Sequence, residues 1–142
     1  MGSRDSGHTL RTRATLLLVA LVLVPVGFGT KAYTGLGEEW VRYHVGGMVY
    51  VVFWCIVGKL GLMRVDSRRV VAGVLALTCI VEVTQLWHPS ALEGLRGSTV
   101  GSALIGQEFD WWDFPHYAAG AFVGLVGLRW LVGEGEDNDG IS

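Results

Sequence analysis

Residues 14–33, "ATLLLVALVLVPVGFGTKAY", contain no charged residue before Lys31. About 20 apolar residues are enough for a helix to cross a hydrocarbon core ~30 Å thick. Inside such a core the backbone can bond only to itself, so a single crossing segment is a helix and not a strand. The stretch therefore predicts that the chain is an α-helical membrane protein.

Three further stretches are apolar over a similar length, namely residues 45–63, 70–87 and 112–132. Hydrophobic residues make up 51% of the 142-residue chain and charged ones only 17%, against about 25% charged in ordinary soluble domains. Most charges lie in short clusters, which leaves the stretches between them almost uncharged. We expect one all-α unit with four transmembrane helices and a short interfacial helix between the third and the fourth.

The first stretch has an alternative interpretation, because Arg11 and Arg13 in front of an apolar run also fit a secretory signal peptide. A cleavage site of the A-x-A kind does not follow it, since "GFGTKAYTG" offers Gly, Thr and Lys where paired small residues are needed. We therefore expect a helix that remains part of the protein.

Basic residues in short loops predict the orientation. Eight fall on one side, which is expected to be cytoplasmic, and three on the other. Residues 1–13 and the acidic residues 133–142 are then cytoplasmic tails, the second one solvated, around a transmembrane domain at 14–132. Lys59 and Arg129 are expected to extend to the cytoplasmic interface. The tryptophans expected to anchor the outer boundary are Trp40, Trp87, Trp111 and Trp112.

Composition also restricts partners and cofactors. The net charge of -2 argues against a nucleic-acid partner, which would normally need a basic face. Cys55 and Cys79 lie within apolar runs and lack the spacing of metal ligands, so we expect small buried side chains, with a disulfide as the less favoured alternative. No metal and no cofactor are expected, and the lipid bilayer is the expected surrounding.

Glu82 is the strongest candidate for a functional side chain. A carboxylate in a membrane helix costs about 2.5–3.5 kcal/mol on insertion scales, so it needs a partner or a purpose. Gln85 follows at i+3 and extends the polar stripe toward the outer side. A protonated structural Glu that holds two helices together is the alternative to a functional site.

The segment "DWWDFPHY", residues 110–117, opens the fourth apolar stretch. Asp113 with Pro115 behind it fits the start of a helix, and N-capping is one explanation of this carboxylate. His116 shares a helix face with Gly120 and Gly124, and small residues at that spacing let another helix approach closely. We expect Asp113 and His116 to face inward near Glu82, with Asp113 orienting the His116 ring.

The loop between the third and fourth stretches adds further polar groups. Ser90 and Glu93 fit the S-x-x-E capping box of a short helix in the interface, where Glu93 and Arg96 can pair. The expected binding residues at the outer mouth, including two from the first outer loop, are Lys31, Tyr33, Glu82, Gln85, His88, Glu93, Arg96, Asp113 and His116. Trp87, Trp111 and Trp112 are expected to surround this site.

At "QLWHPSALEGLR" and "IGQEFDWWDFPHY" the chain resembles the domain of unknown function 2809 family of small multi-pass membrane proteins, and "GTKAYTG" and "VFWC" are similar to earlier blocks of that family. The likeness runs from about Gly29 to Gly124 and implies no established activity. More remotely, "EVTQ" followed by an Arg and an Asp that opens a Gly-spaced helix resembles the VanZ-like proteins, from which "FDWWDF" departs. The recurrent family blocks fall on Gly29, Thr30, Lys31, Tyr33, Gly35, Glu82, Gln85, Trp87, His88, Pro89, Glu93, Arg96, Gly106, Trp112, Asp113 and Pro115.

Four functions remain open at this stage. The first is binding of a lipid or other amphiphile, with Arg96 for an anionic head and tryptophans for the chain region. The second is a membrane-embedded acid–base enzyme acting on a lipid, although no nucleophile motif supports it. The third is a small proton-coupled carrier that uses Glu82, for which a homodimer would supply enough helices. The fourth is a haem anchor that uses His44 and His116.

Overall fold

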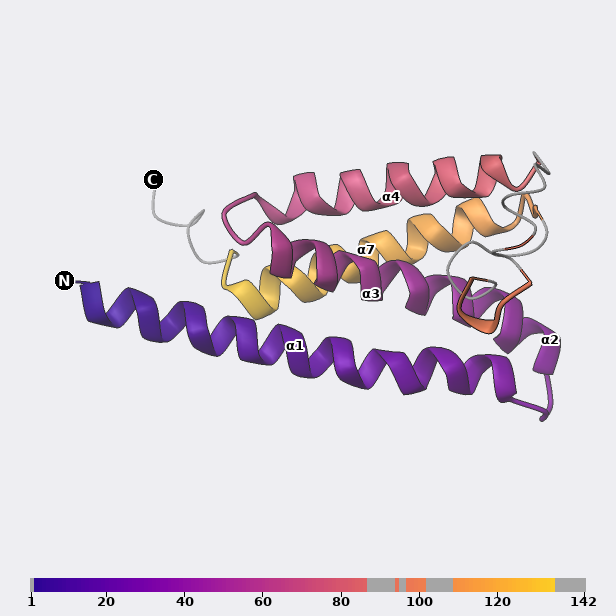
Figure 1. Ribbon diagram of the computed structural model, residues 1–142, viewed down its shortest axis with the longest axis horizontal. Helices are drawn as coiled ribbons and strands as arrows, with labels where there is room; N and C mark the ends of the chain where they lie inside the picture. The colour runs from indigo at the N-terminus through magenta and orange to yellow at the C-terminus, as the bar shows by residue number, and fades with distance from the viewer. Residues whose placement is uncertain (1, 87–93, 95–96, 102–108, 135–142) are drawn as a thin grey trace, which may run out of the picture.

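In the computed structural model, residues 2–86, 94, 97–101 and 109–134 are described, and all regular structure among them is helical. This confirms the all-α expectation for the described residues. Four long helices run in alternating directions along one bundle (Figure 1). Their bounds are α1 Gly2–Ala32, α3 Gly46–Gly61, α4 Ser67–Thr84 and α7 Asp113–Val132, and a short α2 (Glu38–Trp40) and the π-helical turn η1 (Val41–Val45) lead into α3.

One described helix, Gly7–Ala32, is long and apolar enough to cross a membrane by length and composition, while Gly46–Gly61 is apolar but shorter. The four expected spans therefore stay a prediction. The structure also extends α1 back to Gly2, through residues expected to form a separate tail. No proline interrupts that region, and the Thr12 and Thr15 hydroxyls donate to carbonyls four residues earlier, at 3.0 Å each.

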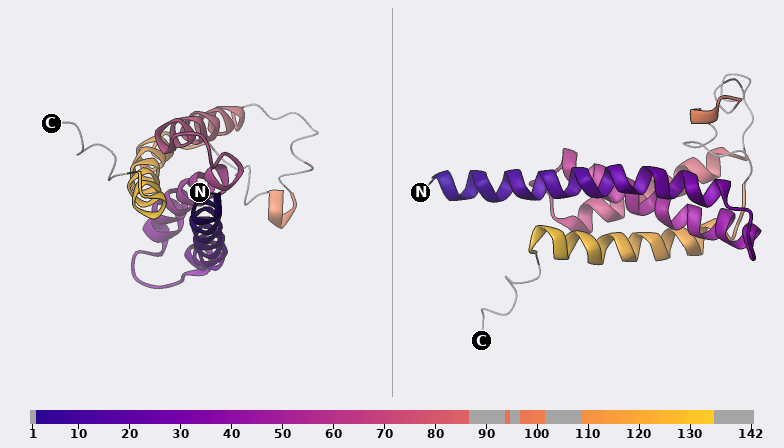
Figure 2. Two further views of the ribbon diagram at one scale, coloured as in Figure 1. Left: turned by 90° about the vertical axis from the view of Figure 1, so that its left-hand side faces the viewer. Right: turned by 90° about the horizontal axis from the view of Figure 1, so that it is seen from below.

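Helix α3 lies at the centre of the bundle, where it packs against α1, α4 and α7 (Figure 2). Two glycines of α7 set the closest approach. A Cβ on Gly120 would lie 2.8 Å from the Met48 carbonyl oxygen, and one on Gly124 would lie 3.1 Å from the Cys55 sulfur. The face expected to permit close helix contact is thus confirmed. Cys55 is buried in this contact, and it and Cys79 are both free thiols, as expected.

Replacing Gly120 with alanine is expected to lower the free energy of unfolding by about 1–3 kcal/mol, because the new methyl group meets backbone atoms that cannot turn aside. The measurement is the midpoint of SDS-induced unfolding in mixed micelles. Gly127→Ala is the matched control in the same helix, since nothing lies within 4 Å of its added Cβ. Equal midpoints for the two variants would contradict the close α3–α7 contact.

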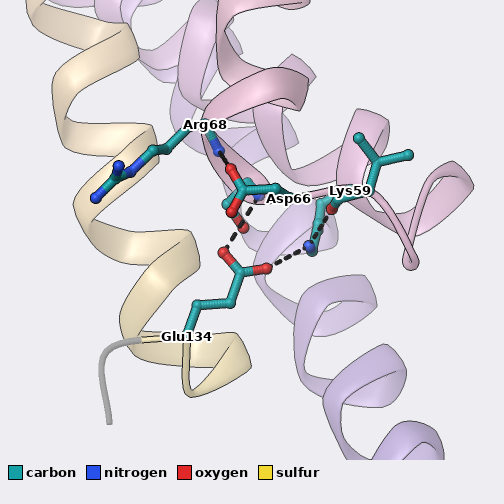
Figure 3. Close-up of polar contacts among 6 residues, drawn as sticks. Lys59, Asp66, Arg68 and Glu134 are labelled. Atoms are coloured by element: carbon teal, nitrogen blue, oxygen red, sulfur yellow. Dashed lines mark hydrogen bonds and ion pairs between the residues drawn. The ribbon is translucent and has the colours of Figure 1, made fainter. Parts of the chain in front are cut away.

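At the end of the bundle where α1 begins and α7 ends, here named the termini end, a buried ion pair joins three helices (Figure 3). The Lys59 ammonium of α3 is 1% exposed and lies 2.6 Å from Glu134 Oε1 and 2.6 Å from the Val65 carbonyl oxygen. The other Glu134 oxygen accepts the Ser67 backbone N–H, at 3.2 Å, at the start of α4. Lys59 thus reaches this end of the bundle as a buried ion-pair partner, and Glu134, expected in a solvated tail, is one quarter exposed and held in the pair. The extension of Lys59 to a membrane interface stays a prediction.

The stability of this end should depend on pH. Burial alone would raise the pKa of Glu134, but hydrogen bonds from Lys59 and Ser67 and the Lys59 charge outweigh it and lower the pKa below its ordinary value of 4.5. A lowered folded-state pKa contributes stability above pH 4.5 that is lost as the pH falls through the folded value. The advantage of wild type over Glu134→Gln in the unfolding midpoint is therefore expected to shrink below pH 4.5. An advantage unchanged in acid would contradict the ion pair.

Candidate functional site

The opposite end of the bundle, where α4 ends and α7 begins, is named the mouth end, and Glu82 lies buried beside it. Its side chain is 1% exposed and lies in the last turn of α4. One carboxylate oxygen accepts the Asp110 backbone N–H at 3.1 Å. The other accepts the Tyr117 hydroxyl at 2.7 Å and the Gln85 side-chain amide at 3.2 Å. Glu82 therefore ties α4 both to α7 and to the segment in front of α7.

Tyr117 extends this network to a second carboxyl group. Its side chain is buried, and its hydroxyl oxygen lies 3.4 Å from Asp113 Oδ2, one turn earlier on α7. Asp113 is half-buried, so it stands between the buried Glu82 and the surroundings of the mouth end. The carboxyl–tyrosine cluster of Glu82, Asp113 and Tyr117 thus joins two acids through one hydroxyl group.

A hydroxyl group carries one proton, whereas this hydroxyl has a carboxyl oxygen on each of two sides. If both acids are ionised, only one of them receives the proton, and the negative charges face each other in a site of low polarity. If one acid is protonated, its own O–H donates to the tyrosine oxygen and both contacts are satisfied. The arrangement therefore has a place for one additional proton shared between Glu82 and Asp113.

His116 takes a different direction from the expected one. Its Nδ1 contacts the Trp112 carbonyl oxygen, one turn earlier, and its ring stacks on His44 with centroids 4.1 Å apart and planes at 12°. Trp40 packs edge-on against His44, with ring centroids 5.7 Å apart. The Trp112 carbonyl is thus the partner of Nδ1, and orientation of the His116 ring by Asp113 stays a prediction. Face-to-face imidazoles also do not fit the axial ligation of one haem iron, which needs the two rings on opposite sides of the metal.

The start of α7 differs from the expected N-cap. Asp113 is the first helical residue, and Trp112 in front of it makes no side-chain cap. Asp110 supplies the local bond instead, since its carboxylate accepts the Trp112 N–H at 2.9 Å. Asp113 is consequently free to face Tyr117, in the first turn where a negative charge suits the helix dipole.

Of the other expected site residues, Gln85 lies in the network and the two from the first outer loop do not. Lys31 is exposed in the last turn of α1, and the Tyr33 hydroxyl donates to the Leu36 carbonyl at 3.4 Å. Trp111 and Trp112 are exposed, and their place around an outer mouth stays a prediction. The expected residues that lie outside the described part of the chain, together with the proposed interfacial helix, are Trp87, His88, Glu93 and Arg96.

Tyr117 and the Asp110 N–H are the functional groups that sequence reasoning missed. Tyr117 follows Asp113 at i+4 and precedes Gly120 by three residues, so it shares the face that approaches α3. That spacing was a usable signal for an inward phenol. Among the described residues, no group of three His, Cys, Asp or Glu is arranged to hold a metal ion.

Fold and site together define an all-helical bundle with a buried carboxyl–tyrosine cluster near one end. The chain belongs to the family described as protein of unknown function (DUF2809), which matches residues 36–121. The match includes Glu82, Asp113 and Tyr117 and leaves out all of α1 and the Lys59 partner Glu134. No solved structure matches the chain. The likeness to VanZ-like proteins stays a prediction.

Proposed function

We propose that the chain is a four-pass membrane protein whose Glu82 and Asp113 take up and release a proton at the outer mouth, as a small proton-coupled carrier does. The single observation that carries the proton-binding role is the Tyr117 hydroxyl between the two carboxyl groups. Both termini are cytoplasmic in this proposal, and the mouth end faces outward.

The distribution of side chains supports placement in a membrane. Large apolar side chains are exposed on three of the four long helices, namely α1, α4 and α7, among them Leu21 (68%), Leu77 (63%) and Trp130 (83%). Soluble monomers rarely expose apolar patches larger than a few hundred Å². Two of the largest fully buried side chains, in contrast, are the charged Lys59 and Glu82. An apolar surface around buried, paired polar groups suits hydrocarbon as the solvent.

The topology can be tested by labelling with a membrane-impermeant maleimide in intact cells. Leu36→Cys, in the exposed turn after α1, should be labelled, whereas Arg64→Cys, in the exposed turn before α4, should react only after the cells are opened. Wild type, with Cys55 and Cys79 alone, is the control. Labelling of both new cysteines in intact cells, or of Arg64→Cys alone, would overturn the proposed arrangement.

The proton can be detected as the C=O stretching band of a protonated carboxyl group. Purified protein in a detergent that has no ester group is measured by infrared spectroscopy at neutral pH, where exposed carboxyl groups are ionised. Wild type should show the band, and Glu82→Gln and Asp113→Asn should each lose it. Glu39→Gln removes an exposed carboxyl group and should leave the band unchanged. A band that persists in both Glu82→Gln and Asp113→Asn would refute the proton-binding role.

A further inference from the structure

A groove lies between α1 and α3 on the outside of the bundle, and its lining includes no member of the carboxyl–tyrosine cluster. Its cavity volume is about 210 Å³, and its lining is almost wholly apolar. Leu23, Gly27 and Phe28 of α1 form one wall, and Tyr50, Phe53 and Trp54 of α3 form the other. The volume is below the range of about 300–1,000 Å³ that is typical of enclosed sites for drug-sized ligands. An open, narrow, apolar groove suits a chain that lies lengthwise.

One charged side chain lines this groove. Lys31 stands in the last turn of α1, at the mouth end. It is exposed and has no ion pair or hydrogen bond within the described part of the chain. Its positive charge is therefore available to an anionic group at the head of the groove.

The dimensions match one leaflet. From Lys31 to Leu23 the groove follows α1 for about 12 Å at 1.5 Å per residue. Half of a ~30 Å hydrocarbon core is about 15 Å, so the groove reaches from the headgroup level through most of one leaflet. Gly27 has no side chain and so leaves room in the groove on the α1 side. A Cβ at this position would lie 3.7 Å from the Val49 side chain.

We propose that this groove binds one acyl chain of an anionic phospholipid of the outer leaflet, with the lipid phosphate on Lys31. The inference rests on the membrane placement proposed above and is independent of the proton on Glu82. A second copy of the chain fits the groove less well, because a two-fold axis along the bundle would bring two Lys31 ammonium groups to the same level.

The test is native mass spectrometry of protein released from nanodiscs that contain phosphatidylglycerol and phosphatidylcholine in equal amounts. Wild type should retain one lipid, with a preference for phosphatidylglycerol of about fivefold, the effect of one basic residue near a charged lipid. Gly27→Leu fills the groove and should release the lipid. Gly29→Leu is the matched control, because Gly29 is exposed on the same helix with open space around it.

The charge is tested separately. Lys31→Gln should retain a lipid but lose the preference for phosphatidylglycerol, and Lys31→Arg should keep both. Equal lipid retention by Gly27→Leu and Gly29→Leu would overturn the proposal, as would an undiminished preference in Lys31→Gln. A lipid-free dimer that Gly27→Leu dissociates would assign the groove to a second copy and overturn it too. Glu82→Gln should retain lipid like wild type, which separates this result from the fate of the proton-binding role.

Discussion

Replacing Glu134 with alanine is expected to lower the free energy of unfolding by about 3 kcal/mol, because the Lys59 ammonium is then left buried without its counter-charge. The ammonium then keeps one of its two hydrogen-bond acceptors, the Val65 carbonyl oxygen, which lies 2.6 Å from Lys59 Nζ. The value is set at the lower end of the range for a broken buried pair, since a quarter of the Glu134 side chain is exposed. The measurement is the SDS unfolding midpoint in mixed micelles.

Replacing the other partner, Lys59, should lower the free energy of unfolding by much less. Lys59→Met replaces the buried ammonium with an apolar side chain of similar length, and the exposed part of Glu134 can still reach water. We expect a loss of about 1 kcal/mol or less, and the double variant should resemble Lys59→Met alone. The lysine side chain is 1% exposed and the glutamate side chain 25%. Equal losses of unfolding free energy for Glu134→Ala and Lys59→Met would contradict this difference in burial.

The helices were predictable because each apolar run is long and is bounded by charges or glycines. Their ends were less predictable. Residues 2–13 contain no proline, and the structure continues α1 through them, whereas charge patterning alone suggested a separate tail. The π-helical turn Val41–Val45 before α3 has no counterpart in the apolar periodicity, since a change from one helical hydrogen-bond pattern to another leaves the order of side chains unaltered.

Glu82 was predictable as a buried group because an apolar helix accommodates a carboxylate only with partners. The identity of those partners was not predictable, because it depends on how α4 and α7 pack. Tyr117 is 35 residues away along the chain and meets Glu82 only in the folded bundle. The glycines of α7 indicated which face of that helix packs against α3. They did not indicate which neighbour the His116 side chain contacts.

The Lys59–Glu134 pair shows the same limit at the termini end. A lysine near the end of an apolar run usually extends to the interface, and an acidic stretch after the last helix usually lies in water. The two residues are 75 positions apart in the sequence. Each was consistent with its general rule until the fold brought α3 and the end of α7 together.

Replacing Glu82 with alanine is expected to cost about 3–5 kcal/mol, the largest loss of any single substitution at the mouth end. Three donors lose their acceptor and a buried cavity remains. Tyr117→Phe removes the hydroxyl contacts to both Glu82 and Asp113 and should lower the free energy of unfolding by about 1–2 kcal/mol. The double variant of Glu82→Ala and Tyr117→Phe should lose less unfolding free energy than the sum of the two single losses. The reason is that removing the hydroxyl group also removes one of the donors that Glu82→Ala leaves unpaired. Glu39→Ala, at an exposed carboxylate, is the control and should remain near wild type.

These stability values also separate the structural role of Glu82 from its proposed proton. Glu82→Gln preserves the shape and one acceptor oxygen, so it should unfold closer to wild type than Glu82→Ala does, while the infrared band disappears. A Glu82→Ala protein as stable as Glu39→Ala would show that the buried hydrogen bonds contribute nothing. The cluster would then not hold α4 against α7, and the fixed position of Tyr117 between two carboxyl groups, on which the proton-binding role depends, would be lost with it.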